Sequence, residues 1–210
     1  MVTSNDSLSY VVWYQSPLHP ELSSPAGNER GRRYNVDGFW PSAFFDGFYR
    51  APQEPNVDSF FSLYKGMAGQ ARSVSSVLSM AIDTANTRVD SALVHVGIHI
   101  TATDTSVDHI SSLMLAAVVF EDSAPFKSLV GGDSLYARFC GRCVIGDTLG
   151  WGVPLKLHFG SDFDTVLTTA PWDTLDGSVR HWNRSRLGVV VLVQDTSSLR
   201  VMQSVSKFRF

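Results

Sequence analysis

The sequence has few glutamates and lysines, and it holds only two cysteines in 210 residues. Its 20 acidic residues are 16 aspartates and 4 glutamates, and its 17 basic residues are 13 arginines and 4 lysines. Long helices with Glu/Lys faces are therefore not expected, whereas 39 serines and threonines favour strands and turns. Two cysteines allow at most one intramolecular disulfide, which excludes a disulfide scaffold.

Strong charge of one sign and long apolar runs are also missing. The net charge of −3 gives no basic field, so general nucleic-acid binding is not expected. The longest apolar run, Leu113 to Phe120, is much shorter than the roughly 18 residues of a membrane helix, so no transmembrane segment is expected. The first residues lack the basic start and apolar stretch of a signal peptide. The Asp-, Arg-, Ser- and Thr-rich composition nevertheless predicts an extracytoplasmic protein, at the cell surface or secreted.

The first third of the chain mixes strand, loop and helix patterns. Residues 8–15 read as a buried strand, and Asn28 is expected to cap a short helix that ends at Tyr34. Pro41 precedes a short apolar strand, which the Asp46-Gly47 turn ends. Apolar residues at three- and four-residue spacing predict an amphipathic helix over residues 57–79.

From about residue 79 the pattern changes to short strands. Residues 195–198 form a turn that joins the last two strands as a hairpin, and residues 161–182 read as loop. Strands at this spacing without helical patterns between them predict an antiparallel sandwich. The expected strands are 89–100, 113–121, 135–145, 153–159, 187–194 and 200–208.

Two groups of motifs resemble a known family. After a strand and a Pro-containing loop, the stretch from Arg32 to Gly47 (RRYNVDGFWPSAFFDG) resembles the second half of a thioredoxin-like domain. The stretch from Trp182 to Asp195, followed by Val-Met-Gln-Ser at 201–204, resembles the closing hairpin of outer-membrane-protein-28-like secreted proteins. Residues 118–122 and 149–152 also suit that family, so the resemblance covers roughly residues 10–208.

The resemblance implies a thioredoxin-like domain joined to an immunoglobulin-like β-sandwich. We therefore expect an α+β chain, with a reduced thioredoxin-like α/β unit over residues 1–78 and the antiparallel sandwich over residues 79–210. Pro41 matches a proline that is usually cis in the family. The family's first strand and its Cys-x-x-Cys helix have no counterpart before Tyr10. Either residues upstream of this sequence are missing or the fold has lost its redox half, and in both cases the residues given lack the family's redox site.

A thioredoxin-like sheet without its first strand has an uncovered apolar face and an unpaired edge. That edge would lie at Val11, Val12, Trp13 and Tyr14. Because unpaired edges favour strand addition, we expect pairing with a second copy or with a protein partner. The sequence thus predicts a non-catalytic structural or binding protein, in a surface layer or fibre.

Cys140 and Cys143 form a Cys-x-x-Cys and give the alternative function, a thiol-disulfide oxidoreductase or a remnant of one. Reactive pairs of this kind sit at a helix N-terminus, whereas these two lie in an expected strand. Residues three apart in a strand face opposite sides and lie about 10 Å apart, beyond disulfide reach unless a bulge at Gly141 draws them together. Packed thiols are the other interpretation.

Metal ligands are the next candidates. His95 and His99 share one strand face but lie about 13 Å apart, so they cannot bind the same zinc ion. One of them could form a ligand pair with His158 of another strand, but polar positions on a solvated face are the favoured interpretation. His19 and His181 lie in expected loops. Aspartate pairs at 104/108, 162/164 and 173/176 are compatible with calcium, but Asp-rich turns are the commoner explanation of such pairs. We predict no metal and no cofactor.

Motifs of other enzyme classes are missing: the sequence has neither Gly-x-Ser-x-Gly nor a phosphate-binding glycine loop. The aromatic residues between Phe39 and Tyr49 form either core or a binding patch. A carbohydrate- or peptide-binding sandwich that uses residues 161–182 is a third possibility. Sequons at Asn5 and Asn183 are possible glycan sites.

Overall fold

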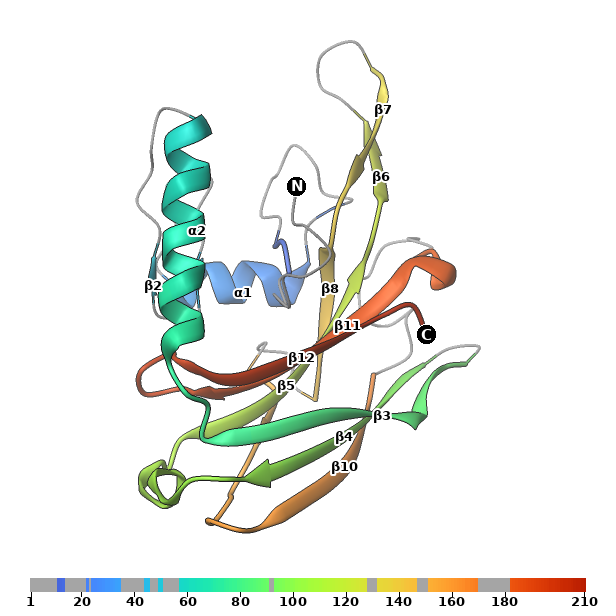
Figure 1. Cartoon of the computed structure of the whole chain (residues 1–210). Coiled ribbons are helices and arrows are strands. Elements are labelled where there is room, and N and C mark those ends of the chain that lie inside the picture. The colour runs from blue at the N-terminus through green and yellow to red at the C-terminus, as the bar shows by residue number, and fades with distance from the viewer. Residues whose placement is uncertain are drawn as a thin grey trace.

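The computed structural model of the chain describes residues 11–13, 22, 24–34, 44–45, 49–50, 57–90, 93–127, 132–146, 151–169 and 182–210. These residues form mostly antiparallel β-structure with two α-helices, so the chain is α+β with sandwich-like sheets (Figure 1). The elements are α1 (Pro25–Arg33), β1 (Phe44–Phe45), β2 (Tyr49–Arg50), α2 (Val57–Ser73), β3 (Leu78–Val89), β4 (Val94–Ala102), η1 (Thr105–His109), β5 (Leu113–Glu121), β6 (Ala124–Lys127), β7 (Ser134–Ala137), β8 (Cys140–Ile145), β9 (Val153–Pro154), β10 (Asp162–Thr168), η2 (Arg184–Arg186), β11 (Leu187–Asp195) and β12 (Val201–Phe208).

Two sheets enclose the main core. One has the order β10-β4-β3, and the other has the order β12-β11-β5-β8 with β9 paired to β5. Alternate side chains of the strands point into the space between the sheets, as the two-residue period of a strand requires. Most of these side chains are fully buried, and they include Val94, Val96, Ile98, Ile100, Leu115, Ala117, Val119, Val189, Val191 and Val193.

The second face of β5 is also buried. Ala116 and Val118 pack with Val144 of β8 against Ala26 of α1, and Val11 and Trp13 lie against the same cluster. Elements from the first part of the chain thus cover the outer face of the larger sheet. A strand buried on both faces reads as a continuous apolar run, as the sequence of β5 does.

Helix α1 begins earlier than the sequence predicted. The side chain of Ser24, not Asn28, caps it by accepting a hydrogen bond from the Gly27 N–H at 3.1 Å. Pro25 occupies the first turn, where its missing N–H costs nothing. The cap at Asn28 was wrong because the Ser-Pro pair upstream is the stronger start signal.

Three strand predictions needed correction. The expected strand 89–100 is interrupted: Val89 ends β3 and residues 94–100 belong to β4, and between them the Leu93 N–H donates to the Asp90 carboxylate at 2.8 Å. The expected strand 135–145 is two strands, β7 and β8, since Phe139 adopts a φ of 50° between them. Residues 153–159 hold only the short β9.

Strand β10 was missed, because residues 161–182 were read as loop. Asp162, Asp164 and Thr168 alternate with half-buried or buried residues, and polar residues on one face hide the apolar alternation. By contrast, β5 and the β11–β12 hairpin were predicted correctly, and α2 is present but ends at Ser73.

An α+β chain with an antiparallel, sandwich-like arrangement is therefore confirmed. The thioredoxin-like unit, the immunoglobulin-like assignment and the boundary near residue 78 stay predictions. Pro41, Asp46 and Gly47 lie outside the described residues. Within the described part of the chain, neither helix has the length and apolar character needed to cross a membrane.

A buried ion pair fixes one end of β5. Arg142 of β8 donates through Nε and Nη2 to Oε2 of Glu121, at 2.9 and 2.6 Å. The two side chains are only 6% and 2% exposed. Arg142 is the extra residue of a bulge in the β5–β8 ladder. The other Glu121 oxygen accepts the Asn183 N–H at 3.0 Å, so the pair also anchors the chain that enters η2.

We expect Glu121→Gln to lower the free energy of unfolding by about 3 kcal/mol, because it leaves the Arg142 charge buried without a counter-charge. Urea denaturation measures this change. The double variant E121M/R142M is the control, since it removes both charges and should recover most of the loss. If the double variant lost as much unfolding free energy as E121Q, or more, this interpretation of the ion pair would be contradicted.

Candidate interaction surface

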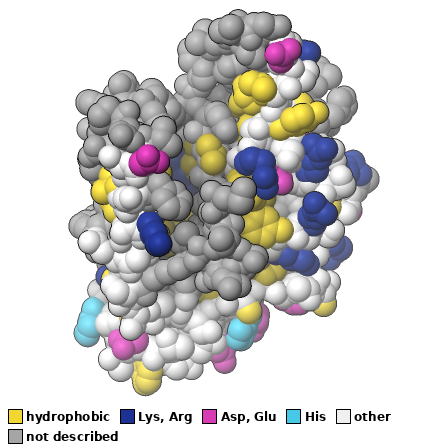
Figure 2. Space-filling view, turned by 45° about the horizontal axis from the view of Figure 1, so that its top comes forward, with side chains coloured by type: hydrophobic (Ala, Val, Ile, Leu, Met, Phe, Trp, Pro, Cys, Tyr) yellow, Lys and Arg dark blue, Asp and Glu magenta, His cyan; other side chains and the backbone are white. Residues whose placement is uncertain are grey.

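One side of the molecule combines exposed aromatic and basic side chains (Figure 2). It is built from the β6–β7 hairpin, η2 and the end of β12. Tyr136 is 60% exposed and Phe208 is 51% exposed. We name it the aromatic–cationic surface, and its residues are Lys127, Tyr136, Arg138, Phe139, Arg184, Arg186, Phe208 and Arg209.

Three phenylalanine rings hold this surface to the sheet. Phe120, Phe139 and Phe208 form a triangle of edge-to-face contacts, with ring centroids 5.5 to 5.6 Å apart. Gly188 of β11 makes room for the Phe120 ring, because a Cβ at this position would lie 2.4 Å from Phe120 Cζ. The buried ring of β5 therefore positions the exposed ring of β12.

The arginines are placed by contacts with rings and backbone. Arg186 donates to the Ser123 carbonyl at 3.0 Å, and its Cζ lies 5.9 Å from the Tyr136 ring centroid. Arg138 pairs with Asp122 and lies 4.9 Å from the Phe139 centroid. Guanidinium groups over aromatic faces gain cation–π attraction and keep donors available at the surface.

The opposite charge collects on the outer face of the smaller sheet. Arg88 is the only Lys or Arg residue in strands β3, β4 and β10. We name the outer side of this sheet the acidic face, and its carboxylates are Asp83, Asp90, Asp162 and Asp164. In Figure 2, Lys and Arg side chains gather on the right around hydrophobic ones, whereas His and several acidic side chains lie at the lower end.

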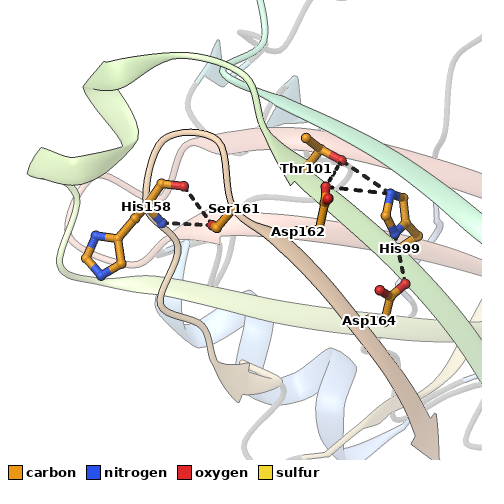
Figure 3. Close-up of polar contacts among 6 residues, drawn as sticks. All are labelled: His99, Thr101, His158, Ser161, Asp162 and Asp164. Carbon is orange, nitrogen blue, oxygen red and sulfur yellow. Dashed lines mark hydrogen bonds and ion pairs between the residues drawn. The ribbon is translucent and has the colours of Figure 1, made fainter.

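The cross-strand register of β4 and β10 brings histidine and aspartate together on the acidic face (Figure 3). Asp164 lies opposite His99, and its Oδ1 is 2.8 Å from His99 Nδ1. Asp162 lies opposite Thr101 and accepts its hydroxyl hydrogen bond at 2.6 Å. The hydrogen bond and the charge of Asp164, together with the charge of Asp162, raise the pKa of His99 above its ordinary value of 6.5.

We expect Asp164→Asn to lower the pKa of His99, because the substitution removes the largest cause of the upward shift. NMR titration of the imidazole measures it. The pKa of His99 is higher in the folded state than in the unfolded state. Protonated His99 therefore stabilises the fold fully below its unfolded-state pKa, and this stabilisation is lost as the pH rises through its folded-state pKa. Asp83→Asn on the same face is the control. An unchanged His99 pKa in D164N would contradict the assigned cause.

The other predicted histidine and aspartate ligands are spread over separate partners. His95 contacts Asp90 at 2.7 Å and Thr168 at 3.0 Å, and His158 lies 3.4 Å from Asp108. Asp104 caps η1. Among the described residues, no group of three His, Cys, Asp or Glu side chains is arranged to hold a metal ion. The remaining candidates, His19, His181, Asp173 and Asp176, lie outside the described residues.

Cys140 and Cys143 are both buried thiols in β8. Cys140 packs with Leu22, Ala124 and Ala137, whereas Cys143 belongs to the core between the two sheets. The bulge at Arg142 lies between them, but it leaves the two thiols in different clusters. Cys140 also lies 3.3 Å from the Leu22 carbonyl.

We expect both thiols to resist alkylation at neutral pH until the protein unfolds, because burial restricts access of the reagent. Mass spectrometry after iodoacetamide treatment, with and without urea, measures this. Fast modification of either cysteine in the native protein would favour the redox interpretation instead.

The predicted self-association edge lies beside β8. The Val12 N–H donates to the Phe139 carbonyl and the Val12 carbonyl accepts the Gly141 N–H, both at 2.9 Å, in a parallel bridge. Val11 and Trp13 are half-buried, and Tyr14 lies outside the described residues. Pairing of this segment with a second copy stays a prediction. The sequon residue Asn183 is exposed and caps η2, while Asn5 lies outside the described residues.

No family model matches the chain, and no curated protein matches it. Among solved structures, HBP35 of Porphyromonas gingivalis has a TM-score of 0.63 and 11% identity over 87% of this chain. The chain spans 56% of the length of that protein. A domain of the outer membrane lipoprotein Omp28 from the same organism has a TM-score of 0.40 and 13% identity, over 63% of this chain and 88% of that one. The likeness to HBP35 shows the fold.

Proposed function

We propose that this chain is an extracytoplasmic, non-catalytic protein that self-associates head to tail. The aromatic–cationic surface of one copy would dock on the acidic face of the next. The observation that carries the proposal is the separation of charge over one chain. Five of its 17 Lys and Arg residues belong to the first surface, where Asp122 pairs with Arg138, while the second has four aspartates and one arginine.

The chemistry of the two surfaces supports docking between copies. Arginine, tyrosine and phenylalanine are enriched at protein–protein interfaces, whereas lysine is depleted, and four of the five cations here are arginines. Guanidinium groups bind carboxylates in a two-point geometry, and Asp162 and Asp164 are 61% and 77% exposed. Contacts between two different surfaces do not close by twofold symmetry, so they extend into rings or fibres.

The surface location of the protein is supported by composition and family resemblance. Aspartate, arginine, serine and threonine replace the Glu and Lys of long helices. The sequence motifs at 182–195 and 201–204 resemble outer-membrane-protein-28-like secreted proteins. A self-associating chain of this kind suits a surface layer or fibre.

Two other routes are less well supported. Strand addition at Val11 to Tyr14 meets the difficulty that the Val12 peptide groups already bond to β8. The oxidoreductase alternative is not favoured by Cys140 and Cys143, because the two buried thiols pack in different clusters.

Charge reversal tests the docking of the two surfaces. We expect R184E/R209E and D162K/D164K each to abolish self-association, because each places like charges opposite each other. An equimolar mixture of the two variants should restore it, since the reversed surface of one variant matches the reversed face of the other. Light scattering at low salt measures the assembly mass.

Lys65→Glu, in the exposed face of α2, is the matched control and should assemble like the wild type. A wild-type monomer of 23.1 kDa at high micromolar concentration would contradict the proposal. Assembly that survives in both double variants would assign self-association to another region, such as Val11 to Tyr14.

A further inference from the structure

His99, on the outer side of the smaller sheet, lies between two carboxylates of the neighbouring strand β10 (Figure 3). Its Nδ1 atom is 2.8 Å from Asp164 Oδ1, and its Nε2 atom is 3.9 Å from Asp162 Oδ1. The Thr101 Oγ1 atom is 3.2 Å from the same Nε2 atom. The His99 side chain is 45% exposed, so a proton from the solvent can reach the ring.

The partners of His99 favour the ring that carries two hydrogens. A carboxylate accepts hydrogen bonds and does not donate them, so the contact with Asp164 requires a hydrogen on Nδ1. The Thr101 hydroxyl donates its one hydrogen to Asp162 at 2.6 Å, so its oxygen accepts a hydrogen bond from Nε2. Both ring nitrogens of His99 are then donors, which is the charged imidazolium form. A neutral ring lacks one of these hydrogens and loses one of the two contacts.

His95, on the same face, is the contrasting case. Its Nε2 atom contacts the Asp90 carboxylate at 2.7 Å, whereas its Nδ1 atom contacts Thr168 Oγ1 at 3.0 Å. Because the Thr168 hydroxyl can donate to Nδ1, the neutral ring satisfies both contacts. Arg88 also lies opposite His95 in the register of the sheet, and a positive charge there opposes a second one. The geometry therefore favours proton uptake at His99 over His95.

Among the described residues, the charged groups that face His99 from the neighbouring strands are carboxylates. On β10 they are Asp162 and Asp164. On β3, the uncharged Ala81 lies opposite His99, and Asp83 is the next residue on that side. With neutral histidines, four aspartates and one arginine give the acidic face a net charge of −3. Protonation of His99 reduces this charge to −2 and places the new positive charge between two exposed carboxylates.

We propose that His99 is a proton-operated switch of head-to-tail association. This inference rests on the proposed function, because it concerns the docking of arginines on Asp162 and Asp164. Neutral His99 leaves the full charge of both carboxylates to an incoming guanidinium group. Protonated His99 competes with that group for the same carboxylates and repels it. A copy must therefore release the proton of His99 before it docks, so assemblies dissociate as the pH falls.

The switch operates near neutral pH. Histidine titrates between about pH 5 and pH 8, and the hydrogen bond with Asp164, followed by the charges of Asp164 and Asp162, raises the pKa of His99 above its ordinary value of 6.5. The cations of the aromatic–cationic surface are lysine and arginine, which keep their charge over this range. A change of association with pH therefore reports on the acidic face.

Sedimentation velocity of the full chain at about pH 9 and about pH 6, at one low ionic strength, tests the switch. We expect the dissociation constant for self-association to be about tenfold higher, or more, at the lower pH. His99→Gln should make the two constants nearly equal, because glutamine is neutral at both pH values. His95→Gln, and His158→Gln outside the three strands, are the matched controls and should keep the response of the wild type.

Equal constants at the two pH values, or tighter association at the lower one, would overturn the switch and leave head-to-tail docking in place. A response that persists in H99Q would also overturn the switch. A wild-type monomer at about pH 9 would overturn the docking itself, and the switch with it. If H99Q does not fold, binding of a short oligoarginine peptide to R184E/R209E, which keeps the acidic face, decides. Tighter binding at the higher pH supports the switch, and equal binding overturns it.

Discussion

The burial of β5 on both faces is the constraint on which the rest of the structure depends. Leu115, Ala117 and Val119 complete the core between the two sheets, while Ala116 and Val118 require cover from outside. Helix α1 and the segment around Val12 provide that cover. Because apolar surface contributes roughly 25 cal/mol per Å² when it is buried, a sheet with two apolar faces needs three layers.

Charged and polar side chains therefore lie at the strand ends and on the outer faces of the sheets. Glu121 ends β5 as one half of a buried ion pair, and the same residue anchors the chain that enters η2. Phe120, one position earlier, supports the rings of the aromatic–cationic surface. The smaller sheet has only one buried face, so its outer side is available for His and Asp. The separation of charge thus follows from the layering.

The sequence predicts the fold where a single pattern dominates. The apolar run of β5 and the β11–β12 hairpin were found because their burial is uniform. Strand β10 was missed because Asp162 and Asp164 belong to its solvent face. The turn between β3 and β4 was missed because it is closed by a single side chain, that of Asp90. The aromatic–cationic surface combines Lys127 with residues 136–139, 184–186 and 208–209, and only the fold brings them together.

Sedimentation velocity of the wild-type chain over a series of salt concentrations tests head-to-tail docking most directly. The screening length falls from about 10 Å at 0.1 M salt to about 3 Å at 1 M, so contacts between oppositely charged surfaces weaken strongly over this range. Docking of the aromatic–cationic surface on the acidic face predicts large assemblies at low salt that dissociate toward 23.1 kDa monomers at high salt. A monomer at every salt concentration, or assemblies that grow as salt is added, would contradict it.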